Sequence, residues 1–103
     1  MVFKMLIVVS SGGFRLDLAK KLAKETAGLG AAAGIVFISN SLYGLRRKAG
    51  APLGEMEGVA VMAHKVGLAE RGIVASEIAE GARIINDDEL LELMIESERA
   101  MCF

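Results

Sequence analysis

Residues 5–9 are MLIVV, and the apolar run that contains them, Phe3–Val9, is interrupted only by Lys4 before Ser10-Ser11-Gly12-Gly13. An unalternating run rich in Ile and Val predicts a strand that is buried on both faces, as in parallel sheets. A second such run, AGIVFIS at Ala33–Ser39, follows a segment of helical length. Two buried strands joined by a helix form a right-handed crossover, so this unit predicts an α/β fold with a parallel sheet.

The segment between the two strands, Phe14–Leu29, has the periodicity of an amphipathic helix. We expect its buried stripe to consist of Leu18, Ala19, Leu22, Ala23, Thr26 and Leu29, and its solvated side to carry Arg15, Lys20, Lys21, Lys24 and Glu25. Gly28 and Gly30 predict the end of this helix, because glycine commonly terminates helices.

Residues 40–103 continue the alternation of strands and helices. The expected strands are Gly58–Ala63, Ala82–Ile85 and Ala100–Phe103, and the expected helical segments are a short one within Asn40–Pro52, Lys65–Arg71, a turn at Ser76–Ala79, and one that follows Asn86. Asn86 with Glu89 three residues on forms a capping-box pattern. The last helix is predicted to bury Leu90, Leu91, Met94 and Ile95. We therefore expect one domain, residues 1–103, built as an open, mostly parallel sheet of about five strands that helices cover on both faces.

Composition excludes several classes of protein. The 53% content of hydrophobic residues excludes intrinsic disorder. Twelve basic and thirteen acidic residues, with four Phe, one Tyr and no Trp, offer neither a broad basic surface nor a base-stacking platform, so we expect no direct contact with nucleic acid. The first apolar run is too short for a secretory signal or a membrane span. We expect a cytoplasmic protein without a membrane partner.

The segment Ser10-Ser11-Gly12-Gly13 lies where the first strand passes into a helix. Ligands of open α/β sheets bind beyond the carboxyl ends of strands, and free amides at a helix N-terminus attract anions. These four residues are therefore candidates for binding an anion or a nucleotide, together with Asn40 after the second strand. A tight turn that needs small residues explains the same segment. The segment matches neither the dinucleotide fingerprint nor a P-loop, and we expect no cofactor.

His64 and Lys65 follow the third strand directly, where a histidine can serve as a general base or contact an anion. Cys102, the single cysteine, is either a buried small hydrophobe or a nucleophile with a depressed pKa. His64 and Cys102 are the candidate catalytic residues, although a structural role is the favoured interpretation of each of them. With one His and one Cys, the sequence offers no set of metal ligands, and we expect no metal.

Two further features concern partners. Arg46-Arg47-Lys48, near Tyr43, forms a short cationic cluster that fits either an anionic partner or a solvated surface. The high apolar content of so short a chain favours a homo-oligomer, since any apolar surface left exposed would need a cover.

The arrangement resembles the DsrE/DsrF/DsrH superfamily of small sulfur-relay proteins. The resemblance rests on Gly58-Val-Ala-Val-Met-Ala, on Leu68-Ala-Glu-Arg71-Gly72-Ile73, which is similar to the family's L-x-A-R-G-[IV] segment, and on Glu80-Gly81-Ala82. The ending Ser97–Phe103 is similar to the family's DRV-x-x-F tail, and Phe37–Ser41 stands where relatives carry F-x-x-D-G-V. The likeness extends over nearly the whole chain through short motifs.

The resemblance implies a flavodoxin-like three-layer α/β/α fold, assembly into dimers, trimers or hexamers, and transfer of sulfur between protein thiols for tRNA thiolation or sulfur metabolism. In active members a cysteine just ahead of the Arg-Gly segment carries the persulfide. Here Ala63–Leu68 contains no cysteine, and Gly67 or His64 stands in its place.

Sulfur transfer requires a thiolate, which no neighbouring side chain replaces. We therefore expect an accessory, thiol-less subunit that works with homologous relay subunits or with a persulfide-carrying protein, with His64 and Lys65 lining the pocket for a partner's cysteine. Two alternatives stay open: a sulfur carrier that uses Cys102, and an anion- or nucleotide-binding module at the carboxyl ends of the strands.

Overall fold

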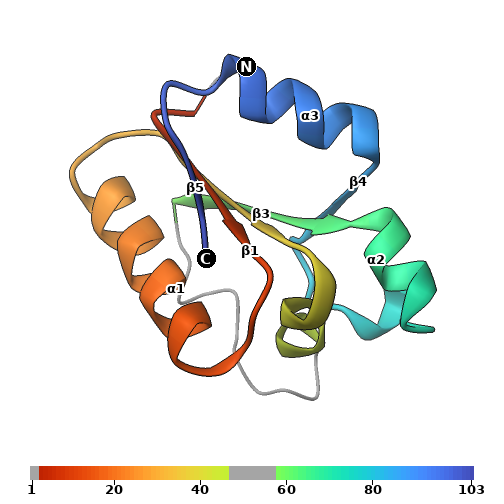
Figure 1. Ribbon diagram of the computed structural model, residues 1–103. Coiled ribbons are helices and arrows are strands. Elements are labelled where there is room, and N and C mark those ends of the chain that lie inside the picture. Colours follow the sequence, from red (N-terminus) through yellow and green to blue (C-terminus); the bar gives the residue numbers. More distant parts are fainter. Residues whose placement is uncertain (1–2, 47–57) are drawn as a thin grey trace.

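A computed structural model describes residues 3–46 and 58–103 of the chain (Figure 1). Its centre is a five-stranded sheet in which every neighbouring pair is parallel, in the order β4-β3-β2-β1-β5. The strands are β1 (Met5–Val9), β2 (Ala33–Phe37), β3 (Val59–His64), β4 (Arg83–Ile85) and β5 (Ala100–Cys102). The flavodoxin-like α/β class, with about five parallel strands, is confirmed.

Helices connect the strands as predicted, with small shifts of their ends. They are α1 (Gly13–Gly28), α2 (Lys65–Glu70) and α3 (Asp87–Glu96), with 3-10 helices η1 (Ser39–Leu45) and η4 (Ala75–Glu77). The short helix expected after Asn40 is η1, and the turn expected at residues 76–79 is η4. Arg47 and Lys48 of the cationic cluster lie outside the described residues.

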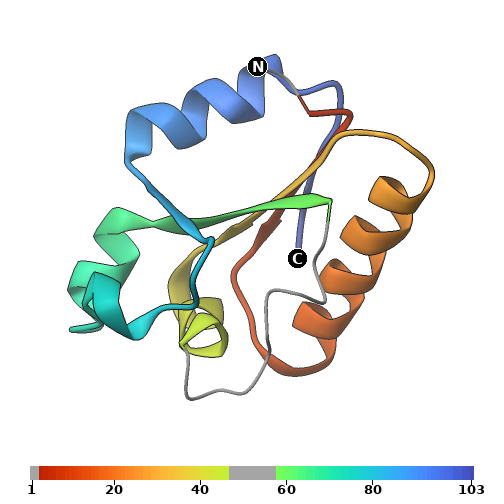
Figure 2. The ribbon, with the colours of Figure 1, turned by 180° about the vertical axis from the view of Figure 1, so that it is seen from behind.

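The order of the strands explains how the helices divide between the two faces. β1, β2, β3 and β4 follow one another in a single direction across the sheet, and the chain then returns to place β5 beside β1. Because crossovers between parallel strands are right-handed, reversing the direction moves the connection to the opposite face. α1, η1 and α2 therefore cover one face, and α3 alone covers the other (Figures 1 and 2).

Burial of the strands follows their place in the sheet. β2 is buried along its whole length, and β1 along all but its first residue. The face under α1 is packed by one apolar cluster that includes Ile7, Ile35, Phe37 and Leu42. The other face has a smaller cluster that includes Leu6 and Val36, with α3 contributing only partly buried side chains. The α3 side of the sheet is consequently the thinner layer.

The buried stripe predicted for α1 was partly wrong. Ala19 and Ala23 are buried as expected, but Leu18 is 42% exposed and Leu29 is 88% exposed. Leu16 takes the buried place instead. The small side chains at 19 and 23 let the helix approach the sheet closely, which turns the larger leucines at its edges outward.

Two expectations for the C-terminal half were also wrong. α3 packs on the sheet through Leu90, as expected, and through Leu93, whereas Leu91, Met94 and Ile95 are 59%, 38% and 72% exposed. The option of a buried Cys102 is excluded as well, because the whole of β5 is exposed at the edge of the sheet. The capping box of Asn86 and Glu89 is confirmed, with both reciprocal hydrogen bonds present. No helix within the two described ranges is long and apolar enough to cross a membrane.

Candidate functional site

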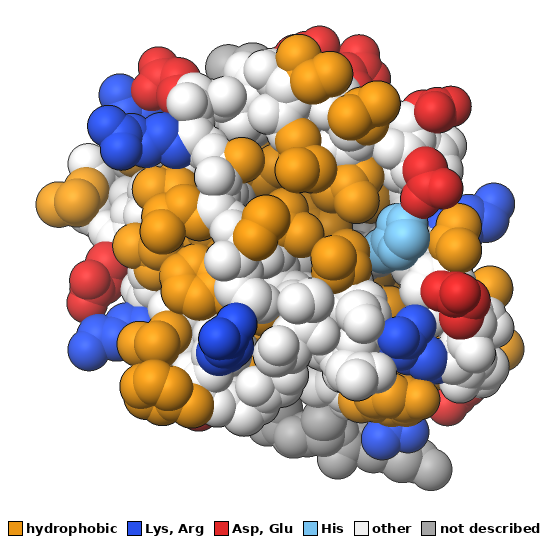
Figure 3. Space-filling model, viewed as in Figure 1, with side chains coloured by type: hydrophobic (Ala, Val, Ile, Leu, Met, Phe, Trp, Pro, Cys, Tyr) orange, Lys and Arg blue, Asp and Glu red, His pale blue; other side chains and the backbone are white. Residues whose placement is uncertain are grey.

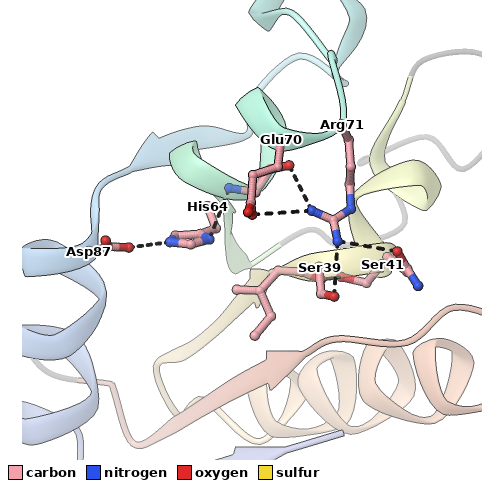
Figure 4. A network of polar contacts seen from close by, with 9 residues as sticks. Ser39, Ser41, His64, Glu70, Arg71 and Asp87 are labelled. Atoms are coloured by element: carbon pink, nitrogen blue, oxygen red, sulfur yellow. Dashed lines mark hydrogen bonds and ion pairs between the residues drawn. The ribbon is translucent and has the colours of Figure 1, made fainter.

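Polar side chains gather at the carboxyl ends of β2 and β3 (Figure 4). Ser39 and Asn40 follow β2, and His64 ends β3. Arg71 follows α2 and points back toward the end of β2. Because all strands are parallel, these carboxyl ends lie along one edge of the sheet, which is where open α/β proteins bind ligands. This group of residues is the candidate site.

The imidazole of His64 is held on both sides. Nδ1 accepts a hydrogen bond from the backbone N–H of Gly67 at 3.3 Å, which caps α2. A ring nitrogen that accepts carries no proton, so the proton lies on Nε2, which donates to Asp87 Oδ1 at 2.5 Å. The His64 side chain is only 17% exposed, while the Asp87 side chain is 71% exposed. With both nitrogens engaged, His64 is an oriented, fixed group that can move a proton only if one contact opens.

The guanidinium of Arg71 is surrounded mainly by neutral acceptors. Nη1 donates to the carbonyl oxygen of Gly67 at 3.0 Å, and Nη2 donates to Ser39 Oγ at 3.3 Å and Asn40 Oδ1 at 3.4 Å. The carboxylate of Glu70 lies 3.8 Å from Nη1 and is itself 68% exposed. Nε is buried and has no hydrogen-bond partner within the described residues. Arg71 therefore carries a largely buried positive charge whose ion pair with the exposed Glu70 is long, at 3.8 Å.

The backbone of Ser39 is strained at this edge of the sheet. Its φ angle is +54°, and no other non-glycine residue in the described ranges has a positive φ. Serine in the left-handed region costs about 1–3 kcal/mol, and such residues cluster at functional sites. The conformation turns the chain from β2 into η1 and presents Ser39 Oγ to Arg71.

Gly67 is enclosed by its neighbours. A Cβ atom at this position would lie 2.7 Å from Leu42 Cδ1 and 3.3 Å from His64 Nδ1. Leu42 is fully buried, so it has little freedom to withdraw. Of the two positions that the resemblance offers for a thiol, Gly67 thus accepts a side chain only if Leu42 shifts.

An open groove of about 550 Å³ lies beside the His64–Asp87 pair, between α2 and the start of α3. Its lining mixes a small apolar surface with charged groups from both helices, namely Lys65, Val66, Ala69, Glu70, Asn86, Asp87 and Asp88. The exposed Lys65 lines this groove, whereas His64 is not among the lining residues and reaches it only through its contact with Asp87. Nothing in the described part of the chain gathers three or more potential metal-ligating His, Cys, Asp or Glu side chains.

The four residues after β1 occupy a neighbouring position on the same edge. Ser10 is engaged with the C-terminus, since its hydroxyl and its N–H both donate to the carbonyl oxygen of Phe103. Its own carbonyl accepts from the N–H of Ser41 in η1 at 3.1 Å, which places the start of α1 next to the end of β2. Ser11 is half-buried, and Gly12 and Gly13 are exposed. Gly13 has a φ of +63°, so the turn itself requires glycine there.

Sequence reasoning missed Arg71, Ser39 and Asp87 as members of the site. Asp87 lies 23 residues from His64, but the register pairs His64 with Ile85, so the two residues after Ile85 emerge beside the imidazole. The signal was available, because Asn86 and Asp87 directly follow a predicted strand that neighbours the third one. Cys102 is not part of the site: β1 and β2 separate β5 from β3, which at about 4.8 Å per strand is roughly 14 Å.

Comparison with known proteins gives a match in structure. No protein-family model matches the chain, and no curated protein matches its sequence. The crystal structure of the ychN protein from E. coli superposes with a TM-score of 0.83 at 18% sequence identity, over 98% of this chain and 99% of that one. The two chains share a fold. At this identity the similarity establishes the architecture, and the function has to be argued from the site.

Proposed function

We propose that this chain is an accessory subunit of a cytoplasmic sulfur relay, without a thiol at the position of the family's cysteine, serving tRNA thiolation or sulfur metabolism. In this role it holds the cysteine of a persulfide-carrying partner at the carboxyl ends of β2 and β3. The observation that carries the proposal is a buried cation, Arg71, which faces mainly neutral acceptors at the carboxyl ends of β2 and β3, where the residues that follow these two strands include no cysteine. The fold shared with the ychN protein is the one that the sequence resemblance implied.

The charge of Arg71 suits the chemistry of sulfur transfer. An acceptor thiolate attacks the outer sulfur of a persulfide, a new sulfur–sulfur bond forms, the old one breaks, and the donor cysteine leaves as a thiolate. A nearby cation stabilises such a thiolate and lowers the pKa of the corresponding thiol. The hydrogen bonds of Arg71 go to a carbonyl, a hydroxyl and an amide oxygen, and its one carboxylate neighbour, the exposed Glu70, lies 3.8 Å away and can swing into solvent when an anion arrives. Lys65 adds an exposed cation next to His64.

The crowding at Gly67 supports an accessory role. A side chain there would overlap Leu42, so the cysteine that the resemblance places just ahead of Arg71 would fit here only if this buried leucine moved. At the other position, His64 is tied to Gly67 and Asp87. In this proposal the donor thiol, the acceptor thiol and the transferred sulfur atom all belong to partner proteins, while this chain supplies charge and position.

The test measures transfer of sulfur from a persulfide-bearing peptide to a second thiol peptide, with and without the purified chain. We expect the wild type to accelerate the transfer and Arg71→Gln to lose about tenfold of that acceleration, since a hydrogen bond to a charged group contributes about 1.5–3 kcal/mol. Arg71→Lys should retain part of the effect. Lys24→Gln, which removes an exposed cation from α1, is the matched control. Equal rates for the wild type and Arg71→Gln would refute the proposal.

A variant with its own thiol tests the accessory role directly. In a Cys102→Ser background, His64→Cys places a thiol beside the Gly67 peptide. We expect this variant to take up sulfur from the persulfide peptide, visible as a mass increase of one sulfur atom, whereas the Cys102→Ser parent takes up none. If the wild type carries the added sulfur atom on Cys102, its single cysteine, the chain is a carrier and not an accessory subunit.

The anion- or nucleotide-binding alternative depends on residues 10–13 and Asn40. A thermal-shift screen with nucleotides and with inorganic phosphate tests it, because a ligand at 100 times its Kd adds about 2.7 kcal/mol of stability. We further propose that the protein is a homo-oligomer, which is supported by exposed apolar side chains on α1 and α3.

A further inference from the structure

α3 has a second apolar side that no described residue of its own chain covers. Leu91, Met94 and Ile95 are 59%, 38% and 72% exposed, and their spacing places them on one side of the helix. Leu90 and Leu93 pack on the sheet from the other side. Figure 3 shows apolar side chains over α3 and across the middle of the same view.

The charges of α3 restrict what can cover this surface. The helix carries five carboxylates and no basic residue between Asp87 and Glu96. Asp87 contacts His64 and Glu89 contacts Arg83, but Asp88 and Glu92 are exposed. Two copies of α3 facing each other would bring these carboxylates together, which disfavours a symmetric α3–α3 contact. The complementary surface has to be apolar and basic.

α1 offers such a surface on the opposite face of the sheet. Phe14 is 76% exposed and Leu18 is 42% exposed. The helix carries four basic residues (Arg15, Lys20, Lys21, Lys24) against two acidic ones (Asp17, Glu25), a net charge of 4 − 2 = +2. Among the helices described, α2 has one Lys and one Glu, so α1 is the one with an excess of positive charge.

We propose that the exposed side of α3 in one copy of the chain packs on the exposed side of α1 in the next copy. The two helices cover opposite faces of the sheet (Figures 1 and 2), so the contact joins two different surfaces. In a pair of copies, the α1 surface of one copy and the α3 surface of the other therefore stay unoccupied. Such a head-to-tail contact closes into a ring or extends into a chain. This inference deepens the homo-oligomer proposed above and involves no sulfur chemistry.

Two double variants test the contact. Phe14→Glu/Leu18→Glu disables the α1 surface, and Leu91→Glu/Ile95→Glu disables the α3 surface. All four side chains are exposed, so both variants should keep the circular dichroism of the wild type. By light scattering coupled to gel filtration, the wild type should exceed its monomer mass of 10.9 kDa. Each variant alone should be a monomer, and an equimolar mixture should form a heterodimer and nothing larger, because it contains one intact surface of each kind.

The same measurement identifies the competing arrangements. If copies associated through α3 alone, the α1 variant would keep the wild-type mass, and the proposal would be wrong. A wild type that stays monomeric at sub-millimolar concentration would also overturn it. Association should weaken with added salt, because part of the contact is between opposite charges. The oligomer mass is measured without any sulfur donor. A negative result in this experiment therefore leaves the Arg71 test of sulfur transfer unaffected, and a negative Arg71 test leaves the α3–α1 contact unaffected.

Discussion

Gly67→Ala should destabilise the protein although alanine is the better helix former. Replacing glycine by alanine within a helix contributes up to about 1 kcal/mol of stability. Here the new methyl group would lie 2.7 Å from Leu42 Cδ1, whereas carbon atoms in contact are about 3.5–4.0 Å apart. Leu42 is fully buried, and overpacking of a core costs about 1–3 kcal/mol. The overlap outweighs the gain in helix propensity.

The matched control is Gly28→Ala at the end of α1, where an added Cβ meets nothing within 4 Å. The two substitutions are chemically identical and differ in the space around them. Gly67→Ala should therefore be less stable than Gly28→Ala by about 1–3 kcal/mol. For a domain near 100 residues this corresponds to a melting temperature lower by at least about 4 °C.

A double-mutant cycle attributes the effect to Leu42. Leu42→Val removes the overlapping Cδ1 atom, so Gly67→Ala should cost less in that background than in the wild type. Urea unfolding followed by circular dichroism gives all four free energies of unfolding. Equal stability of Gly67→Ala and Gly28→Ala, or additivity in the cycle, would show that Gly67 is not enclosed and would remove one support of the accessory role.

Two further predictions concern the helices. Leu16→Ala should lower the free energy of unfolding by about 2–5 kcal/mol because it leaves a cavity under α1. Leu18→Ala, two residues away, replaces a partly exposed side chain and should change the urea midpoint little. Similar losses for the two variants would contradict the observed orientation of this helix on the sheet. Asn86→Ala should lower the free energy of unfolding by about 1 kcal/mol through loss of the α3 cap, and Asn86→Gly by only a few tenths, so a neutral Asn86→Ala would mean that the capping box contributes nothing.

The sheet was predictable from sequence because its central strands have a strong and simple signal. β1 and β2 are continuous apolar runs, and burial on both faces leaves no polar alternation to confuse them with a surface strand. The capping box of Asn86 was predictable for a similar reason, since it depends on two residues three positions apart. Signals of this kind are local, and the fold preserves them.

The orientation of the helices was harder to predict because each helix carries apolar residues on more than one side. On α1, leucines occur on more than one side, and the two alanines that decide the closest approach give no strong signal. On α3, apolar side chains point both to the sheet and to solvent, so the pattern alone does not identify the inward side. An excess of apolar residues thus obscures orientation, and it is the same excess that leaves surfaces free for a partner.

The site was only half predictable, since its contacts depend on strand order and register. His64, Lys65 and Asn40 follow from the rule that ligands bind at the carboxyl ends of strands. The contact of His64 with Asp87 requires that β4 lie next to β3 in a particular register. The contact of Arg71 with Ser39 spans 32 residues and requires that α2 end above β2. Neither follows from spacing in the sequence.

The energetics of this edge favour a functional site over a purely structural tie. A guanidinium whose role was only to join α2 to β2 would be expected to satisfy all its donors, yet the buried Nε of Arg71 has no partner among the described residues, at a cost of about 1–3 kcal/mol. Its bonds to Ser39 and Asn40, at 3.3 and 3.4 Å, are longer than optimal. Ser39 adds backbone strain at the same place. These three unfavourable features around one cation lower the stability of the fold. They have a physical reason if an anion that arrives with a partner shortens these contacts and binds the unsatisfied charge.

Measuring both the melting temperature and the transfer rate of Arg71→Gln distinguishes the two roles. If Arg71 only joins α2 to β2, the substitution lowers the melting temperature and leaves the rate of sulfur transfer unchanged. If Arg71 belongs to a site, the rate falls by more than the loss of stability explains.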